Sequence, residues 1–209
     1  MKVKKTWSEV IKEAINASLI NVHTSLPARV EKYSEGKADV VILIKRNIND
    51  EIIEYPKLTD VPVMQPRSND GKSFLSLPIK KGDTGMVSFI ERSIDKWLVN
   101  GQSTDPEDAR KFDLSDAIFT PGLYPFSKPL KYESKEATEL KNDKSQLILW
   151  PDGKIELKGN NVDLLSIISD VINHLSSAQI ITAMGPSPFF PSTIANFVAD
   201  QTRLTLIKK

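Results

Sequence analysis

The residues that could hold a metal ion are few and widely spaced. His23 and His174 are the only histidines, and a histidine-based metal site needs neighbouring ligands at short spacing. An acidic stretch could in principle coordinate a hard cation, but it lacks the ligand periodicity and central glycine of a calcium loop. Its members are Asp105, Glu107, Asp108, Asp113 and Asp116. We therefore expect ordinary surface or capping histidines and solvated loop carboxylates, with no metal site and no cofactor.

Residues for catalysis are no easier to find. The sequence contains no nucleophile elbow, phosphate loop, dinucleotide fingerprint or zinc-peptidase helix. The turn from Lys80 to Gly85 has two lysines and two glycines but not the spacing that cradles a phosphate. There is no cysteine, which excludes disulfides and thiolate metal sites. The chain is therefore predicted not to be an enzyme.

Composition favours a folded chain without a strong electrostatic partner. Hydrophobic residues make up 40% of the sequence, enough for a core, and the net charge of +1 lacks the basic excess typical of nucleic-acid binding. The longest aliphatic run, from Val40 to Ile44, is far too short for a membrane-spanning helix.

An amphipathic helix is predicted at the start of the chain, in a first segment covering residues 1–20. Thr6 and Glu9 have the spacing of a capping box. Apolar residues then recur at helical spacing and form one stripe, consisting of Val10, Ile11, Ala14, Ile15 and Leu19. This stripe must be buried against the following domain or against another subunit.

A small β-barrel is predicted for residues 21–126. Short alternating or β-branched runs follow one another between turn signals, the last of them at Lys96–Val99. Five or six strands in about eighty residues are typical of a closed Greek-key barrel, for which an OB-fold is the natural candidate. We expect Phe89 and Trp97 in its core and Gly82, Gly101 and Gly122 at its turns.

An OB-fold also raises an alternative function, the binding of single-stranded nucleic acid by stacking bases on aromatic side chains in a basic groove. The candidate side chains are Tyr33, Phe74, Phe89 and Trp97, with Arg29, Arg46, Lys81 and Arg92. Acidic residues are interleaved with them, and core packing also explains Phe89 and Trp97. A gel shift with single-stranded DNA at low salt would show whether the chain binds nucleic acid.

Beyond the barrel we expect a charged linker at 127–145 and a β segment at 146–160. Asp152-Gly153 between two apolar-rich strands predicts a hairpin. An isolated hairpin is marginal in water, so this one is expected to pair with two identical chains in an intertwined trimer.

A helical tail is predicted for residues 161–209, with Asn161 as the N-cap of its first helix. Leu164, Ile168, Val171 and Leu175 have coiled-coil spacing and are the candidate trimer seam. The alternative is that this helix packs against its own barrel. The aromatic pair Phe189 and Phe190, in a predicted loop, is a candidate contact for another protein.

Several strings in one order resemble a known family, the phage membrane-piercing spikes at the centre of contractile-tail baseplates. The resemblance covers about residues 20–126 and is clearest in the strings that begin at Asp95 (D-K-W-L-V-N-G) and Asp113 (D-L-S-D-A). It implies an OB-fold collar that docks on a trimeric baseplate hub, followed by an intertwined trimeric β-structure. The overall prediction is a mainly β chain with terminal helices.

The function that this resemblance implies is mechanical. The homotrimer would be a virion component of the tail baseplate, assembled in the host cytoplasm, that closes the tail tube and transmits force to the host envelope. The chain is expected to bind two further copies of itself and the hub protein, with a separate tip protein as a further candidate partner. Its contact with the host envelope would be transient, and no nucleic acid is expected. Spikes of this family commonly end in a long β-helix with a His-x-His metal site, and this sequence has neither. We therefore expect a short, blunt spike or hub plug.

Overall fold

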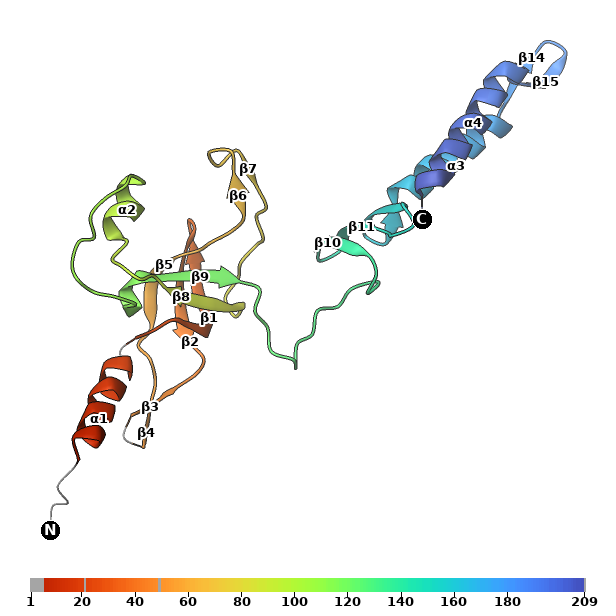
Figure 1. Cartoon of the computed structure of the whole chain (residues 1–209). Helices are drawn as coiled ribbons and strands as arrows, with labels where there is room; N and C mark the ends of the chain where they lie inside the picture. The colour runs from red at the N-terminus through yellow and green to blue at the C-terminus, as the bar shows by residue number, and fades with distance from the viewer. Residues whose placement is uncertain (1–5, 21, 49, 209) are drawn as a thin grey trace. The chain divides into compact units, whose positions relative to one another are not determined.

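The computed structural model describes residues 6–20, 22–48 and 50–208, which divide into two compact units on either side of Pro129. Both units are rich in β-strands, and helices lie near each end of the chain (Figure 1). Among the described residues, no helix has the length and apolar character needed to cross a bilayer.

The N-terminal unit begins with helix α1, Trp7–Ile20, as expected. The backbone N–H of Thr6 donates to Oε2 of Glu9 at 2.7 Å, and the N–H of Glu9 donates to Oγ1 of Thr6 at 3.3 Å. This capping box satisfies two amides that have no partner inside the helix.

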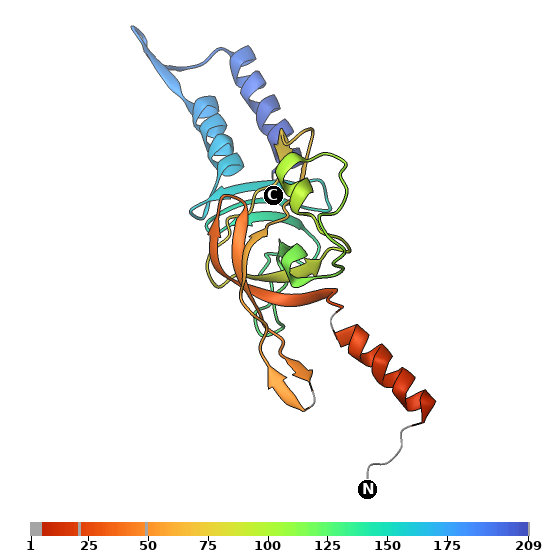
Figure 2. The ribbon, with the colours of Figure 1, turned by 90° about the vertical axis from the view of Figure 1, so that its left-hand side faces the viewer.

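Five antiparallel strands follow in one curled sheet, in the order β5-β2-β1-β8-β9 (Figure 2). Their bounds are β1 Ser25–Ser34, β2 Lys37–Ile42, β5 Leu58–Pro62, β8 Thr84–Phe89 and β9 Ala117–Pro121. Register shifts interrupt the pairing of β1 with β2 and of β2 with β5, and such irregularities bend and twist a sheet. The curl brings the two edges together at one bridge between Val63 and Phe119, so the sheet forms a half-barrel.

The core of the half-barrel follows from the alternation of side chains along each strand. Inward positions carry small or β-branched residues and two phenylalanines: Ala28, Val30, Ala38, Val40, Leu58, Val61, Val87, Phe89, Ala117 and Phe119. Gly85 lies where a Cβ atom would be 2.3 Å from the carbonyl oxygen of Thr120 and 2.6 Å from the Phe119 ring. The absence of a side chain at Gly85 therefore lets β8 and β9 approach closely.

Smaller elements project from this sheet. Two short hairpins are formed by β3 Arg46–Ile48 with β4 Glu51–Ile53, and by β6 Arg67–Ser68 with β7 Ser73–Phe74. Helix α2, Asp95–Asn100, and the single-turn helix η1, Leu114–Asp116, lie between β8 and β9. The strand expected at Lys96–Val99 is thus a helix, and β9 was not anticipated as a strand.

The C-terminal unit contains a four-stranded antiparallel sheet, two helices and a hairpin. The sheet has the order β10-β11-β12-β13, with bounds Thr138–Asn142, Ser145–Leu149, Ile155–Gly159 and Val162–Asp163. Helix α3, Leu164–Ser177, packs against β12 and against helix α4, Pro191–Ile207. Strands β14, Gln179–Thr182, and β15, Gly185–Pro188, connect the two helices as a hairpin.

This unit corrects three expectations. The predicted linker at 127–145 contains strand β10, because Leu140 pairs with Leu147 while charged neighbours occupy an edge strand, where they are well tolerated. The hairpin at 146–160 consequently does not stand alone, because it has strand partners within its own chain, β10 and β13. The tail at 161–209 is not purely helical, since β14 and β15 interrupt it.

The first helix of the tail also begins later than expected. Its N-cap is Asp163 rather than Asn161, and the Asp163 carboxylate accepts a hydrogen bond from the Ser166 N–H at 2.8 Å. Asn161 has φ of 65° and belongs to the turn before β13, whose two residues pair with β12.

Candidate functional site

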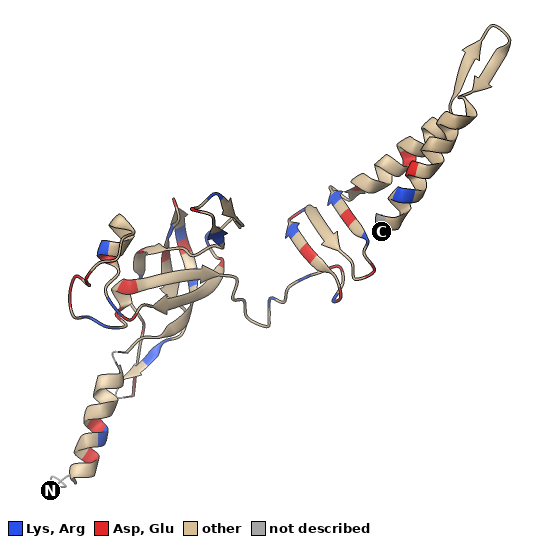
Figure 3. Ribbon diagram, turned by 45° about the horizontal axis from the view of Figure 1, so that its top comes forward, with Lys and Arg blue, Asp and Glu red and all other residues tan. Residues whose placement is uncertain are grey.

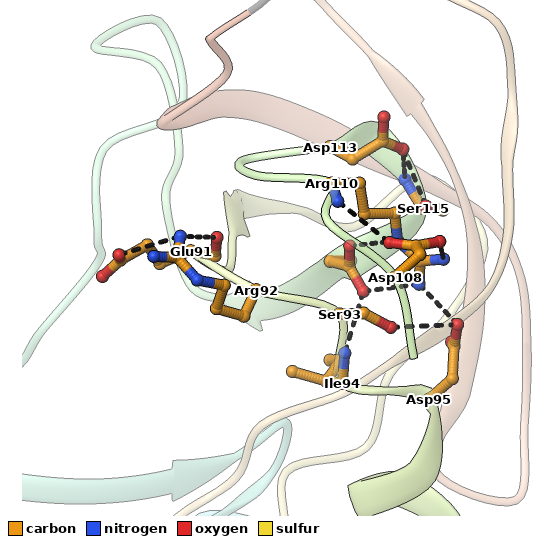
Figure 4. Close-up of polar contacts among 10 residues, drawn as sticks. Glu91, Arg92, Ser93, Ile94, Asp95, Asp108, Arg110, Asp113 and Ser115 are labelled. Atoms are coloured by element: carbon orange, nitrogen blue, oxygen red, sulfur yellow. Dashed lines mark hydrogen bonds and ion pairs between the residues drawn. The ribbon is translucent and has the colours of Figure 1, made fainter. Parts of the chain in front are cut away.

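A buried ion-pair cluster lies where the two motif strings of the N-terminal unit meet (Figure 4). Nε of Arg110 donates to Oδ2 of Asp116 at 2.6 Å, and Nη2 donates to Oδ1 of the same carboxylate at 2.9 Å. The Asp116 side chain is fully buried, and that of Arg110 is 22% exposed. This bidentate geometry is the strongest form of an arginine–carboxylate contact.

Two further carboxylates surround the same guanidinium. Nη2 of Arg110 also pairs with Asp95, and Nη1 donates to Oδ2 of Asp108 at 2.9 Å. Asp116 in turn accepts the backbone N–H of Ile94 at 3.0 Å. The cluster therefore ties three separate pieces of chain together: the start of α2, the loop at Asp108, and η1.

Arg110 and Asp116 stabilise each other's charged form. The Arg110 hydrogen bonds lower the pKa of Asp116, with burial opposing and the Ile94 N–H assisting. The hydrogen bonds that Arg110 donates to Asp116 and then to Asp95 raise the pKa of Arg110. A buried carboxylate costs several kcal/mol unless it is paired, so the Asp116–Arg110 pair is needed for this loop to fold as it does.

The cluster fixes a short helix that presents apolar side chains to solvent. Asp95 begins α2, and Trp97, Leu98 and Val99 are 50%, 45% and 89% exposed. We call these three residues the α2 knob. The helix ends at Gly101, whose φ of 66° lies in the left-handed region and whose N–H donates to the Trp97 carbonyl at 2.8 Å. Exposed aromatic and aliphatic groups on a rigidly held element are typical of a protein contact.

Of the two residues expected in the barrel core, one is buried there and the other is exposed. Phe89 lies in the core with 4% of its surface exposed. Trp97 is half exposed in the α2 knob, so its assignment to the core is wrong. The local run of large residues resembles a strand, but Asp95 at the start of α2 pairs with Arg110 and Gly101 caps its end, which favours a helix. The three expected turn glycines, Gly82, Gly101 and Gly122, all have positive φ.

Three of the five carboxylates considered for metal binding have other partners. Asp108 and Asp116 bind Arg110, and Asp113 accepts the Ser115 N–H as the N-cap of η1. His23 lies against the rings of Tyr55 and Phe89, and burial lowers its pKa. His174 is in the last turn of α3. In the part of the chain that the structure describes, no group of three metal-ligating side chains is brought together.

The groove imagined for single-stranded nucleic acid is not assembled from its proposed residues. Phe89 is buried and cannot stack on a base. Arg29 and Lys81 both pair with Glu31, and Arg92 pairs with Glu91. Arg46 lies over the ring of Tyr55. Phe74 is 70% exposed at β7, apart from this set in the sheet order.

In the C-terminal unit, leucines from three adjacent strands stand opposite one another. Leu140 of β10 pairs with Leu147 of β11, which pairs with Leu157 of β12. We call these the leucine row. Directly paired residues share a face of a sheet, and Leu140 and Leu157 are 52% and 43% exposed. Ile148 and Glu156, on the other face, are buried.

The expected trimer-seam residues lie on an uncovered side of α3. Leu164, Ile168, Val171 and Leu175 are between 39% and 49% exposed. The adjacent side of the helix faces α4, where Nε2 of Gln201 donates to Oγ of the buried Ser169 at 2.6 Å. The helix therefore packs within its own unit and leaves the four seam residues half exposed.

The two candidate tip-contact residues behave differently. Phe189 packs edge-to-face against Phe197 of α4, with ring centroids 6.3 Å apart. Phe190 precedes α4 as its N-cap residue and is 79% exposed.

Sequence reasoning missed the α2 knob, Arg110 and the leucine row. The leucine row had a visible signal, since Leu140 and Leu157 each stand between charged residues. Arg110 had no such signal in the sequence, because its partners Asp95 and Asp116 lie at unequal distances along the chain and Arg110 itself is in a loop.

A gamma-glutamyl phosphate reductase from Leptospira interrogans serogroup Icterohaemorrhagiae serovar Lai (strain 56601) is 28% identical over 136 residues, which are 54% of this chain and 32% of that protein. The chain thus spans about a third of the length of this curated relative. Such a partial match does not carry that protein's activity to this chain.

Residues 26–122 match the family model described as the phage protein Gp138 N-terminal domain. The match spans the whole half-barrel, the Arg110 cluster and the α2 knob, and it ends at Gly122, one residue after β9. It supports a phage protein whose first domain is similar to that N-terminal domain.

Proposed function

We propose that the chain is a structural protein of a contractile-tail baseplate, where three copies form a central spike or hub plug. The half-barrel is an OB-fold collar that docks on the hub, and the C-terminal unit forms the blunt end. The trimer closes the tail tube and transmits force to the host envelope, without catalysis.

The leucine row is the observation that carries this proposal. A sheet with one buried face and one half-exposed apolar face is stabilised when a further layer packs on the exposed face. Three copies around an axis can each supply that layer, because every leucine row then contacts the rows of its neighbours. The exposed Leu164, Ile168, Val171 and Leu175 of α3 extend the apolar surface that such an assembly would bury.

The match to a phage protein domain supports the location. A baseplate protein needs a rigid surface for its hub, and the α2 knob is an apolar surface of this kind, held in place by Arg110. We assign it to the contact with the hub protein. The alternative nucleic-acid function is less well supported, because Arg29, Lys81 and Arg92 of the imagined groove are already paired with glutamates.

The location can be tested by labelling. Particles from the phage or related injection machine that encodes the chain would be purified with an epitope tag at its C-terminus and imaged by negative-stain electron microscopy with gold-conjugated antibody. We expect gold at the baseplate end of the tail. Gold on heads or along the sheath, or intact particles that lack the chain, would contradict the proposal.

A further inference from the structure

The far end of the C-terminal unit is free of ionised side chains. Of all residues in the protein, 26% are charged, yet no Asp, Glu, Lys or Arg occurs from Val171 to Ala199. This run includes the end of α3, the whole β14–β15 hairpin and the start of α4. Figure 3 shows the hairpin without acidic or basic residues, beyond the ends of both helices.

The side chains at this end are apolar and open to solvent. Ile181 is 91% exposed and Met184, in the turn, is 100% exposed. Ile180 and Phe190 are 46% and 79% exposed. Isolated exposed apolar residues are common, but four in one short uncharged segment mark a surface for an apolar partner.

Three positions in the β14–β15 hairpin have no free backbone N–H group. β15 contains Pro186 and Pro188, opposite Ile181 and Gln179. Proline has no N–H, so Pro186 and Pro188 present no backbone donor at the outer edge of β15. In the turn, Oγ1 of Thr182 donates to the Gly185 carbonyl at 2.7 Å and accepts the Met184 N–H at 3.3 Å. At Pro186, Pro188 and Met184, therefore, no free N–H needs a hydrogen bond from water.

The same prolines disfavour pairing of another β-strand with the outer edge of β15. Addition of a strand at the β15 edge requires donors that Pro186 and Pro188 lack. A bilayer needs neither a hydrogen-bonding edge nor charge complementarity, and it accepts a projecting apolar turn without a preformed groove.

From these observations we propose that the β14–β15 hairpin is a lipid-binding tip, which places Ile181, Met184 and Phe190 at the boundary between headgroups and acyl chains of a bilayer. The hairpin is too short to span, and insertion is shallow. The inference deepens the proposed envelope contact by naming its chemistry, but it rests on the hairpin alone and does not require a trimer.

The test is flotation of the purified full chain with phosphatidylcholine vesicles, which carry no net charge. We expect the chain to float with the vesicles, and the bound fraction to stay unchanged between about 0.1 and about 1 M NaCl, because no ion pair is involved. The double variant Ile181→Asp/Met184→Asp should bind about tenfold less or weaker still. Both side chains are almost fully exposed, so the variant should keep the far-ultraviolet circular dichroism spectrum and melting curve of the parent.

Leu206→Asp is the matched control, since Leu206 is 71% exposed on α4 of the same unit but lies outside the uncharged run. It should float like the parent. Failure of the parent chain to float, equal binding by the double variant, or release at high salt would each overturn the proposal. Sedimentation of the same samples separates the two ideas: hairpin-dependent flotation by a monomer would refute the trimer and keep the lipid-binding tip.

Discussion

The guanidinium of Arg110 holds the fully buried carboxylate of Asp116 through two hydrogen bonds of 2.6 and 2.9 Å. Through this contact, residues of the D-L-S-D-A string and of the D-K-W-L string become one structural element. The pair explains why a loop between β8 and β9 can present a rigid apolar helix.

Removal of Arg110 should destabilise the N-terminal unit strongly. Arg110→Met keeps the aliphatic stem but leaves the Asp116 carboxylate buried without its partner, and we expect a loss of about 3 kcal/mol in the free energy of unfolding. Urea denaturation, followed by tryptophan fluorescence, measures it. Arg29→Met is the control: its pair with Glu31 is solvent-exposed, so its loss should stay within about 0.5 kcal/mol. Equal effects of the two changes would show that the cluster has no special role.

The same pair predicts a pH dependence. The pKa of Asp116 is lower in the folded chain than in the unfolded chain, so its stabilisation is fully present above the unfolded pKa, about 3.9, and is lost as pH falls through the folded value. Between neutral pH and about pH 3, the parent should therefore lose more stability than Asp116→Asn, which cannot titrate at this position. Parallel curves for the two proteins would mean that other carboxylates cause the loss.

Gly85 should not tolerate even alanine. The added Cβ would lie 2.3 Å from the Thr120 carbonyl oxygen, so β8 and β9 must separate, at a cost of about 2 kcal/mol or more. Gly159→Ala is a close control in strand β12, because no atom lies within 4 Å of its added Cβ. Thermal melts should show a clear drop for Gly85→Ala and little change for Gly159→Ala. If Gly85→Ala melts with the parent, the close approach of the two strands is not required.

The α2 knob should matter for binding and little for stability. Trp97→Ala removes a half-exposed ring, so we expect the free energy of unfolding to change by less than about 1 kcal/mol while co-purification with the hub protein is lost. Phe74→Ala, which alters another exposed aromatic of the same unit, should retain the hub. Retention of the hub by Trp97→Ala would move the docking surface elsewhere.

Much of the half-barrel could be predicted from the sequence, because alternation places Val30, Val40 and Val87 on one face without knowledge of their partners. The α2 knob could not, because Trp97-Leu98-Val99 resembles a strand until the contact of Asp95 with Arg110 is known. Strand β9 was hidden in the same way, since Ala117 and Phe119 acquire their burial only when β8 pairs with them.

In the C-terminal unit, the predicted hairpin is present, and it has strand partners in its own chain, β10 and β13. Charged residues around Leu140 suggested a linker, yet their alternation allows an edge strand. We therefore base the proposed trimer on exposed apolar side chains, namely the leucine row and the exposed side of α3, and not on unpaired strand edges.

Charges placed on these faces should divide the assembly. Ile168→Asp/Val171→Asp and Leu140→Asp/Leu157→Asp each put two carboxylates where we expect apolar contact between copies, and unpaired buried charges are strongly unfavourable. Light scattering should give a single-chain mass for both variants and an unchanged mass for Leu206→Asp. A double variant that keeps the parent's mass would exclude its face from the interface.

Sedimentation velocity of the unaltered full chain at micromolar concentration tests the central claim most directly. The proposed assembly predicts one species with three times the 23.4 kDa mass of the chain. A stable monomer at that concentration would contradict it.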